Sequence, residues 1–278
     1  MCKIAAVAAS GTLTLKRERN LLLGVLLVLA SAAWAILIWQ SSTMGSGSGG
    51  GTASILTMGM GVAIFLAMWI AMMAAMMFPT AAPMVLMYAR VQSSRRAKGG
   101  AYVPAGFFVV SYLLVWAAAG ALAYLGALAV GALADHVPWL QQNGARISGG
   151  VLVLAGLYQL SPLKAVCLRQ CRSPMSFVLT HWREGRRGAV AMGLRHGAYC
   201  VGCCWLLFVL LFPLGIMNLA AMGALTIVIF LEKSTAWGAR LAQVFGFALL
   251  VYGAIVISTP AALPGSPGMM GGMGGMSG

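Results

Sequence analysis

Long apolar runs set the first limit on how this chain can fold. Seven segments are almost free of charged residues and are separated by polar or glycine-rich stretches. A helix needs about 20 apolar residues to cross a bilayer. A chain of 278 residues that is 61% hydrophobic and 8% charged cannot hide all of this surface in a soluble core. The sequence therefore predicts an all-α fold, a polytopic transmembrane bundle with about seven spans. They are expected near residues 21–39, 57–78, 104–131, 146–161, 197–212, 214–231 and 241–258.

Basic residues gather on one side of this predicted arrangement. Of the 18 Lys and Arg residues, only Arg146 falls in a connection on the opposite face. The positive-inside rule then places the N-terminus inside and the C-terminus outside a cytoplasmic (inner) membrane that the chain crosses several times. Contact with anionic membrane lipids explains the net charge of +14, and we expect no nucleic-acid partner. The sequence leaves the oligomeric state open.

The predicted organisation has three parts. Residues 1–54 form an N-terminal anchor helix and a flexible Gly/Ser loop, residues 55–258 form the helix bundle, and residues 259–278 form an external tail rich in Met and Gly. The stretch Ala33-Trp34-Ala35 resembles a signal-peptide cleavage site. The apolar run around it is longer than a usual signal core, so a retained anchor is favoured.

A methionine-rich stretch, MWIAMMAAMMFPTAAPM (residues 68–84), is the first candidate site. Five of its methionines follow one broad helix face: Met68, Met72, Met73, Met76 and Met77. Thioethers are soft, uncharged ligands, so they can bind Cu(I) without burying charge. Methionine also fills irregular gaps between helices, and for this stripe alone packing is the favoured interpretation. Pro79 and Pro83 are expected to interrupt the run and loosen the helix.

A second candidate site lies in RHGAYCVGCCW. On a helix, His196, Cys200, Cys203 and Cys204 fall within one arc, and imidazole with thiolates is a ligand set for Zn(II) or Cu(I). Buried cysteines can also act as small apolar residues. Four soft donors on one face favour metal binding.

Two further groups carry soft donors. Cys167 and Cys171 lie four residues apart in a short helix that Pro162 is expected to begin and Pro174 to end, where they suit a metal-docking or redox pair. The tail carries Met269, Met270, Met273 and Met276, which either capture Cu(I) outside or have no role.

Several chemistries find no support in the sequence. No carboxylate falls at the middle of a predicted span, which disfavours a proton relay or a hard-cation site. Glu232 stands beside Lys233, where a salt bridge between the two is expected. The chain has no phosphate-binding glycine motif and no Ser/His/Asp arrangement. The sequence therefore favours a binding protein over an enzyme.

Three stretches together carry a family resemblance: MWIAMMAAMMFPTAAP, GLYQLSPLKAVCLRQCRSP and HGAYCVGCCW. Over approximately residues 55–258 the chain resembles the predicted metal-binding integral membrane proteins known as domain of unknown function 2182. The resemblance implies metal binding at the methionine stripe, at Cys167 and Cys171, and at the His/Cys face, without defining a reaction.

The leading hypothesis is a membrane protein that binds a soft metal ion in copper trafficking, transport or delivery to a membrane metalloenzyme. Copper as Cu(I) fits better than zinc, because thioethers outnumber imidazoles. A metal donor or acceptor protein is the expected partner. The alternative is a membrane oxidoreductase that uses the cysteine pairs in thiol–disulfide or metal-centred chemistry. A purely structural membrane subunit is the third possibility.

Overall fold

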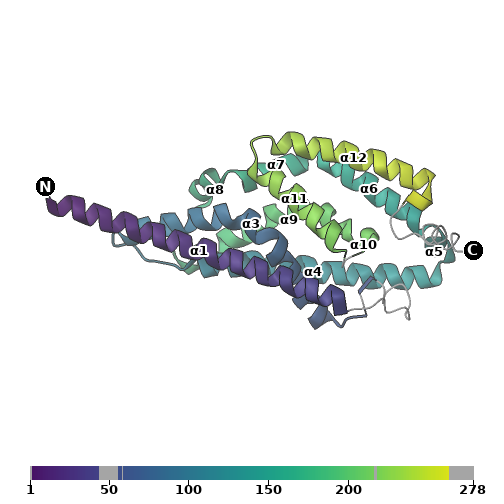
Figure 1. Ribbon diagram of the computed structural model, residues 1–278, viewed down its shortest axis with the longest axis horizontal. Helices are drawn as coiled ribbons and strands as arrows, with labels where there is room; N and C mark the ends of the chain where they lie inside the picture. Colours follow the sequence, from purple (N-terminus) through teal and green to yellow (C-terminus); the bar gives the residue numbers. More distant parts are fainter. Residues whose placement is uncertain (1, 44–55, 58, 216–217, 263–278) are drawn as a thin grey trace, which may run out of the picture.

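The computed structural model describes residues 2–43, 56–57, 59–215 and 218–262, with only the backbone of residues 2–16 and 43. All regular elements within these ranges are helices, which confirms the predicted all-α fold. They are α1 (Cys2–Thr43), α3 (Val62–Arg96), α4 (Ala105–His136), α5 (Pro138–Gln142), α6 (Gly144–Leu160), α7 (Pro162–Arg172), α8 (Pro174–His181), α9 (Gly185–Val209), α10 (Leu211–Leu214), α11 (Leu219–Ser234), α12 (Gly238–Ser258) and a 3₁₀ turn (Pro260–Ala262). The long helices run roughly along one axis in an elongated bundle (Figure 1).

Five helical segments of the described chain are long and apolar enough to cross a membrane: residues 17–42, 62–96, 105–136, 185–214 and 238–258. The bent pair α6 and α7 makes a sixth if it is one span. The remaining predicted span, 214–231, corresponds to α11, which has 16 residues. The expected number of seven and the orientation stay predictions.

Helix α3 differs from the sequence expectation at its prolines. The predicted span ended at residue 78, whereas α3 continues through Pro79 and Pro83 to Arg96. A proline removes one hydrogen bond of the helix, but packing can hold the segment in place. Here Met84 and Tyr88 beyond the prolines are buried in a core cluster with α4, α8 and α9, and this packing accounts for the continuation.

The break between α6 and α7 follows the predicted proline pattern. Ser161 lies between the helices, its hydroxyl accepts a hydrogen bond from the backbone N–H of Lys164 at 3.2 Å, and Pro162 occupies the first turn of α7. The two helices meet at an angle of 62°. Helix α7 ends at Arg172, before Pro174, as expected. The bend turns α7 and its two cysteines across the bundle.

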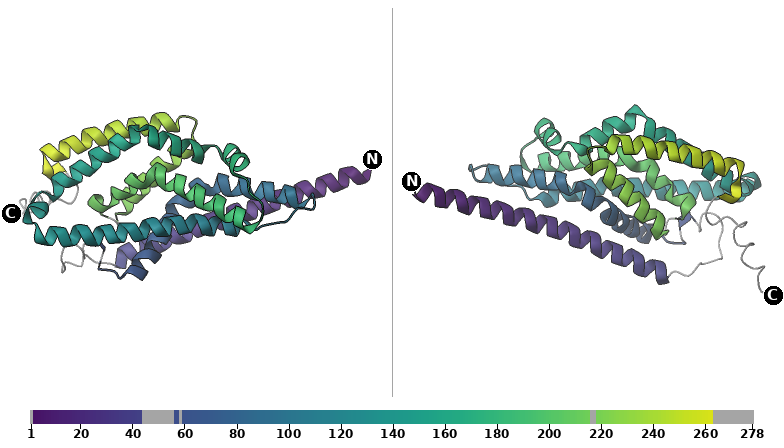
Figure 2. Two further views of the ribbon diagram at one scale, coloured as in Figure 1. Left: turned by 180° about the vertical axis from the view of Figure 1, so that it is seen from behind. Right: turned by 45° about the horizontal axis from the view of Figure 1, so that its top comes forward.

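Glycines bring α6 and α12 into close contact along their length, and the two helices lie side by side in Figures 1 and 2. A Cβ added to Gly156 would lie 2.7 Å from the carbonyl oxygen of Gly246, and one added to Gly253 would lie 2.8 Å from that of Gly149. Small residues at such crossings let helix backbones approach closely. Because α7 follows α6 directly in the chain, this helix pair fixes the point at which α7 begins.

At the centre of the molecule lie α3, α4, α9 and α11. Helix α9 packs on α4, and α11 packs on α3 and α12. The methionine stripe points inward, because Met72, Met73, Met76 and Met77 are all buried. They belong to the same core cluster as Cys200, Cys203 and Cys204. The fold thus places thioethers and thiols in one interior.

Candidate metal centre

Helix α9 turns its His/Cys face into the bundle. His196, Cys200, Cys203 and Cys204 are spaced by four, three and one residues, and all four are buried. Gly193 lets α9 approach α4 closely, because a Cβ there would lie 2.4 Å from the carbonyl oxygen of Phe108. The four residues that the sequence places in one helical arc thus all lie inside the bundle.

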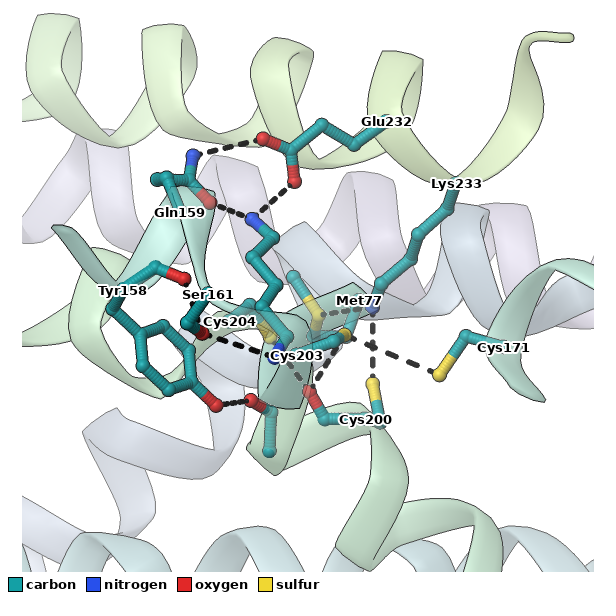
Figure 3. A network of polar contacts seen from close by, with 12 residues as sticks. Met77, Tyr158, Gln159, Ser161, Cys171, Cys200, Cys203, Cys204, Glu232 and Lys233 are labelled. Atoms are coloured by element: carbon teal, nitrogen blue, oxygen red, sulfur yellow. Dashed lines mark hydrogen bonds and ion pairs between the residues drawn. The ribbon is translucent and has the colours of Figure 1, made fainter. Parts of the chain in front are cut away.

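Cys200 is the residue on which the polar contacts of this face converge. Its sulfur lies 3.2 Å from the hydroxyl of Tyr112 and accepts a hydrogen bond from the ammonium of Lys233 at 3.1 Å. The thiols of Cys203 and Cys204 donate to its backbone carbonyl at 3.1 and 2.8 Å (Figure 3). Polar groups from α4 and α11 thus meet at one buried sulfur, and two α9 thiols meet at the carbonyl of the same residue.

The Cys-x₃-Cys helix α7 lies directly against this face. The sulfur of Cys171 lies 4.0 Å from that of Cys203 (Figure 3). Cys167 faces Gly202, where an added Cβ would lie 2.9 Å from its sulfur. Both α7 cysteines are half-buried, and every described cysteine side chain is a free thiol. The two cysteine motifs, separate in sequence, form one cluster.

Met77 connects the methionine stripe to the cysteines. Its sulfur lies 3.7 Å from the ammonium of Lys233, which also contacts Cys200. Met72, Met73 and Met76 share the core cluster, and Met68 packs against it half-buried. Met222 of α11 is a buried thioether of the same cluster that the sequence analysis missed. Met222 stands outside the methionine-rich and cysteine-rich motifs, so no sequence pattern indicated it.

His196 occupies a different environment from the sulfurs. Its ring stacks on Phe108 and Tyr112 at centroid distances of 5.8 and 5.5 Å and meets the edge of Phe177 at 5.5 Å. Its Nδ1 is buried without a hydrogen-bond partner among the described residues. Through Tyr112 the imidazole lies next to Cys200, but the aromatic rings enclose it.

Across the described part of the chain, no three His, Cys, Asp or Glu side chains are arranged to hold a metal ion. The soft donors that do lie close together are Cys171 beside Cys203, and Cys200 and Met77, whose sulfurs both contact the Lys233 ammonium. Such a set suits a soft ion such as Cu(I), for which methionine is a normal ligand. The tail methionines Met269, Met270, Met273 and Met276 lie outside the described residues.

One expectation about charged residues is wrong. Glu232 does not pair with Lys233; its carboxylate accepts hydrogen bonds from Lys164 at 2.7 Å and Gln159 at 2.9 Å. Adjacent residues on a helix point about 100° apart, so the neighbours face different surroundings. Lys233 and Tyr112, which touch Cys200, were absent from the predicted site. The one sequence signal for Lys233 was its position at the end of an apolar run.

A helical bundle with an interior of thiols and thioethers has the donor set of proteins that handle soft metals. A family model described as PpoB2, copper chaperone, matches residues 66–256, which extends from α3 to α12. The chain belongs to this PpoB2 family of copper chaperones. No curated protein and no solved structure matches the chain significantly. The match supports the copper assignment, whereas membership of domain family 2182 stays a prediction.

Proposed function

We propose that this protein is an integral membrane copper chaperone that binds Cu(I) through sulfur and passes it to an acceptor. The observation that carries the proposal is the convergence of Cys171, Cys200, Cys203 and Met77 from three helices in one buried cluster. The copper chaperone family match supports the identity of the metal. Nothing in that match favours the thiol–disulfide alternative.

The sulfur donors favour Cu(I) over Zn(II). Zinc sites use thiolates and imidazoles, whereas thioethers select Cu(I). The enclosed position of His196 between aromatic rings leaves sulfur as the main available donor. Cys204 belongs to the same face and supplies a further thiol as the ion moves.

Copper reaches the cluster along the sulfurs in our proposal. The tail methionines capture the ion outside, the methionine stripe of Met68, Met72, Met73 and Met76 passes it inward, and the cysteine cluster holds it. Cys167 and Cys171, which are half-buried, then exchange it with a metal-accepting protein. The reverse direction uses the same ligands. Uncharged thioethers suit this passage, because no charged side chain has to be buried along the stripe.

The membrane location rests on the apolar helices and on their charge pattern. Five or six helices of sufficient length and apolarity support a protein that crosses a membrane several times and contacts its lipids. The positive-inside pattern favours an N-terminus inside, and the membrane we propose is the cytoplasmic one. Copper held there is available for delivery to a metalloenzyme of the same membrane.

Competition with a chromophoric Cu(I) chelator tests the proposal directly. The full-length protein, purified in detergent with its thiols reduced, is compared with Cys200→Ser/Cys203→Ser and Met77→Leu. Met84→Leu is the matched control, because Met84 is also buried in α3 but lies in the other core cluster. We expect wild type and Met84→Leu to retain Cu(I), the double cysteine variant to lose it and Met77→Leu to bind more weakly. Wild type that takes up no Cu(I) would refute the proposal.

A further inference from the structure

Three charged side chains are buried beside the sulfur cluster. Lys164 and Glu232 are 1% and 2% exposed, and Lys233 is 8% exposed. A buried charge is costly unless an opposite charge or several hydrogen bonds compensate it. Two cations and one carboxylate therefore leave one positive charge that another group must accommodate.

The carboxylate of Glu232 is already satisfied. Lys164 bonds to one of its oxygens at 2.7 Å, Gln159 donates to the other at 2.9 Å, and the Gln159 side-chain oxygen accepts from Lys164 (Figure 3). Within the described residues, Lys233 has no salt bridge to a carboxylate. Its ammonium donates instead to the sulfurs of Cys200 and Met77, at 3.1 and 3.7 Å. The charge of Lys233 is thus held at the metal-binding sulfurs.

We propose that Lys233 determines the specificity of the sulfur cluster by metal charge, favouring monovalent Cu(I) over divalent ions such as Zn(II). The inference rests on the proposed function, because it assumes that the cluster binds Cu(I). It adds a criterion that ligand softness does not provide, since cysteine thiolates bind both ions well.

Electrostatics gives the direction of this selection. The repulsion between Lys233 and a bound ion scales with the charge of the ion, so a divalent ion is repelled twice as strongly as a monovalent one at the same position. Burial keeps this repulsion from being screened by salt. The charges of Lys164 and Glu232 nearly cancel, so the discrimination between monovalent and divalent ions depends on Lys233.

The test measures Cu(I) and Zn(II) affinities of the full-length protein in detergent, each by competition with a chelator. Lys233→Leu and Lys233→Gln remove the charge, the first without and the second with a polar group, and Lys233→Arg keeps it. Arg240→Met is the control, because it removes a positive charge from an exposed position on α12. Any change in thiol ionisation affects both metals, so the ratio of the two affinities isolates the charge effect. Size-exclusion profiles and helical content identify which neutral variant is folded.

We expect the neutral variants to raise the ratio of Zn(II) to Cu(I) affinity by about tenfold or more. Lys233→Arg and Arg240→Met should leave the ratio near the wild-type value. A folded neutral variant that binds Cu(I) with an unchanged ratio would overturn the role of Lys233 while the proposed function stands. Wild type that binds neither metal would overturn both.

Discussion

The ammonium of Lys233 lies 3.1 Å from the sulfur of Cys200, although a buried carboxylate, Glu232, is its neighbour in sequence. The relationship joins the end of α11 to the middle of α9. The cysteine face of α9 therefore does more than pack, because packing alone would not require a buried cation beside it. Phe208 on the same helix shows the apolar alternative, since it packs against the rings of Trp69 and Trp116.

The thiols of Cys171 and Cys203 predict a cross-link between α7 and α9. Their sulfurs are 4.0 Å apart, and a disulfide requires about 2 Å, so a small side-chain movement suffices. We expect a mild thiol oxidant to join these two residues within one chain, detected by mass spectrometry of a protease digest. Cu(I) loaded beforehand should prevent the reaction. Cys171→Ser is the control, and a cross-link formed equally well with bound copper would contradict a shared role of these thiols.

The buried pair of Lys164 and Glu232 is expected to support the bundle. Glu232→Gln leaves the cation of Lys164 in the interior without its carboxylate, which costs about 3–5 kcal/mol. Glu184→Gln breaks the exposed pair with Arg95 and should cost less than about 1 kcal/mol. Thermal unfolding in detergent compares the two variants. Equal midpoints would show that Glu232 contributes no more than a surface charge.

The contact between α6 and α12 is expected to exclude any side chain larger than glycine. Gly156→Ala would place a methyl group 2.7 Å from the carbonyl oxygen of Gly246 and should destabilise the protein by about 1–3 kcal/mol. Gly150→Ala, on the same helix, meets nothing within 4 Å and should be neutral or stabilising. Unfolding midpoints of both variants decide the point. A tolerated Gly156→Ala would mean that the two helices are farther apart.

The orientation predicted from the basic residues can be tested with truncations fused to alkaline phosphatase, which is active only where its disulfides form. A fusion after Lys98 should be inactive, because the connection between α3 and α4 is expected inside. A fusion after Asn143 should be active, because the next connection is expected outside. The opposite pattern would reverse the predicted topology.

The sequence predicted most of the helices and the grouping of the candidate ligands on helix faces, but not that these faces point into the bundle. Proline placement was sufficient for α7, whose bounds follow Pro162 and Pro174, and periodicity was sufficient to group the cysteines of α9 on one face. These are local signals, and each acts within a few turns of helix.

Long-range partners were not predictable in the same way. The choice of Lys164 rather than Lys233 by Glu232 depends on where α7 lies against α11, which no local pattern encodes. The continuation of α3 through two prolines likewise depends on packing of Tyr88 and its neighbours with α4, α8 and α9. The sequence shows which side chains could bind a metal, whereas the packing of the helices decides which of these side chains meet.

X-ray absorption at the copper edge of the Cu(I)-loaded protein tests the central claim most directly. Coordination by Cys171, Cys200, Cys203 and Met77 predicts a first shell made of sulfur, which Cys200→Ser/Cys203→Ser should lose together with the metal. A first shell dominated by nitrogen or oxygen, or one that is unchanged in the double variant, would contradict a sulfur-bound copper site at these residues.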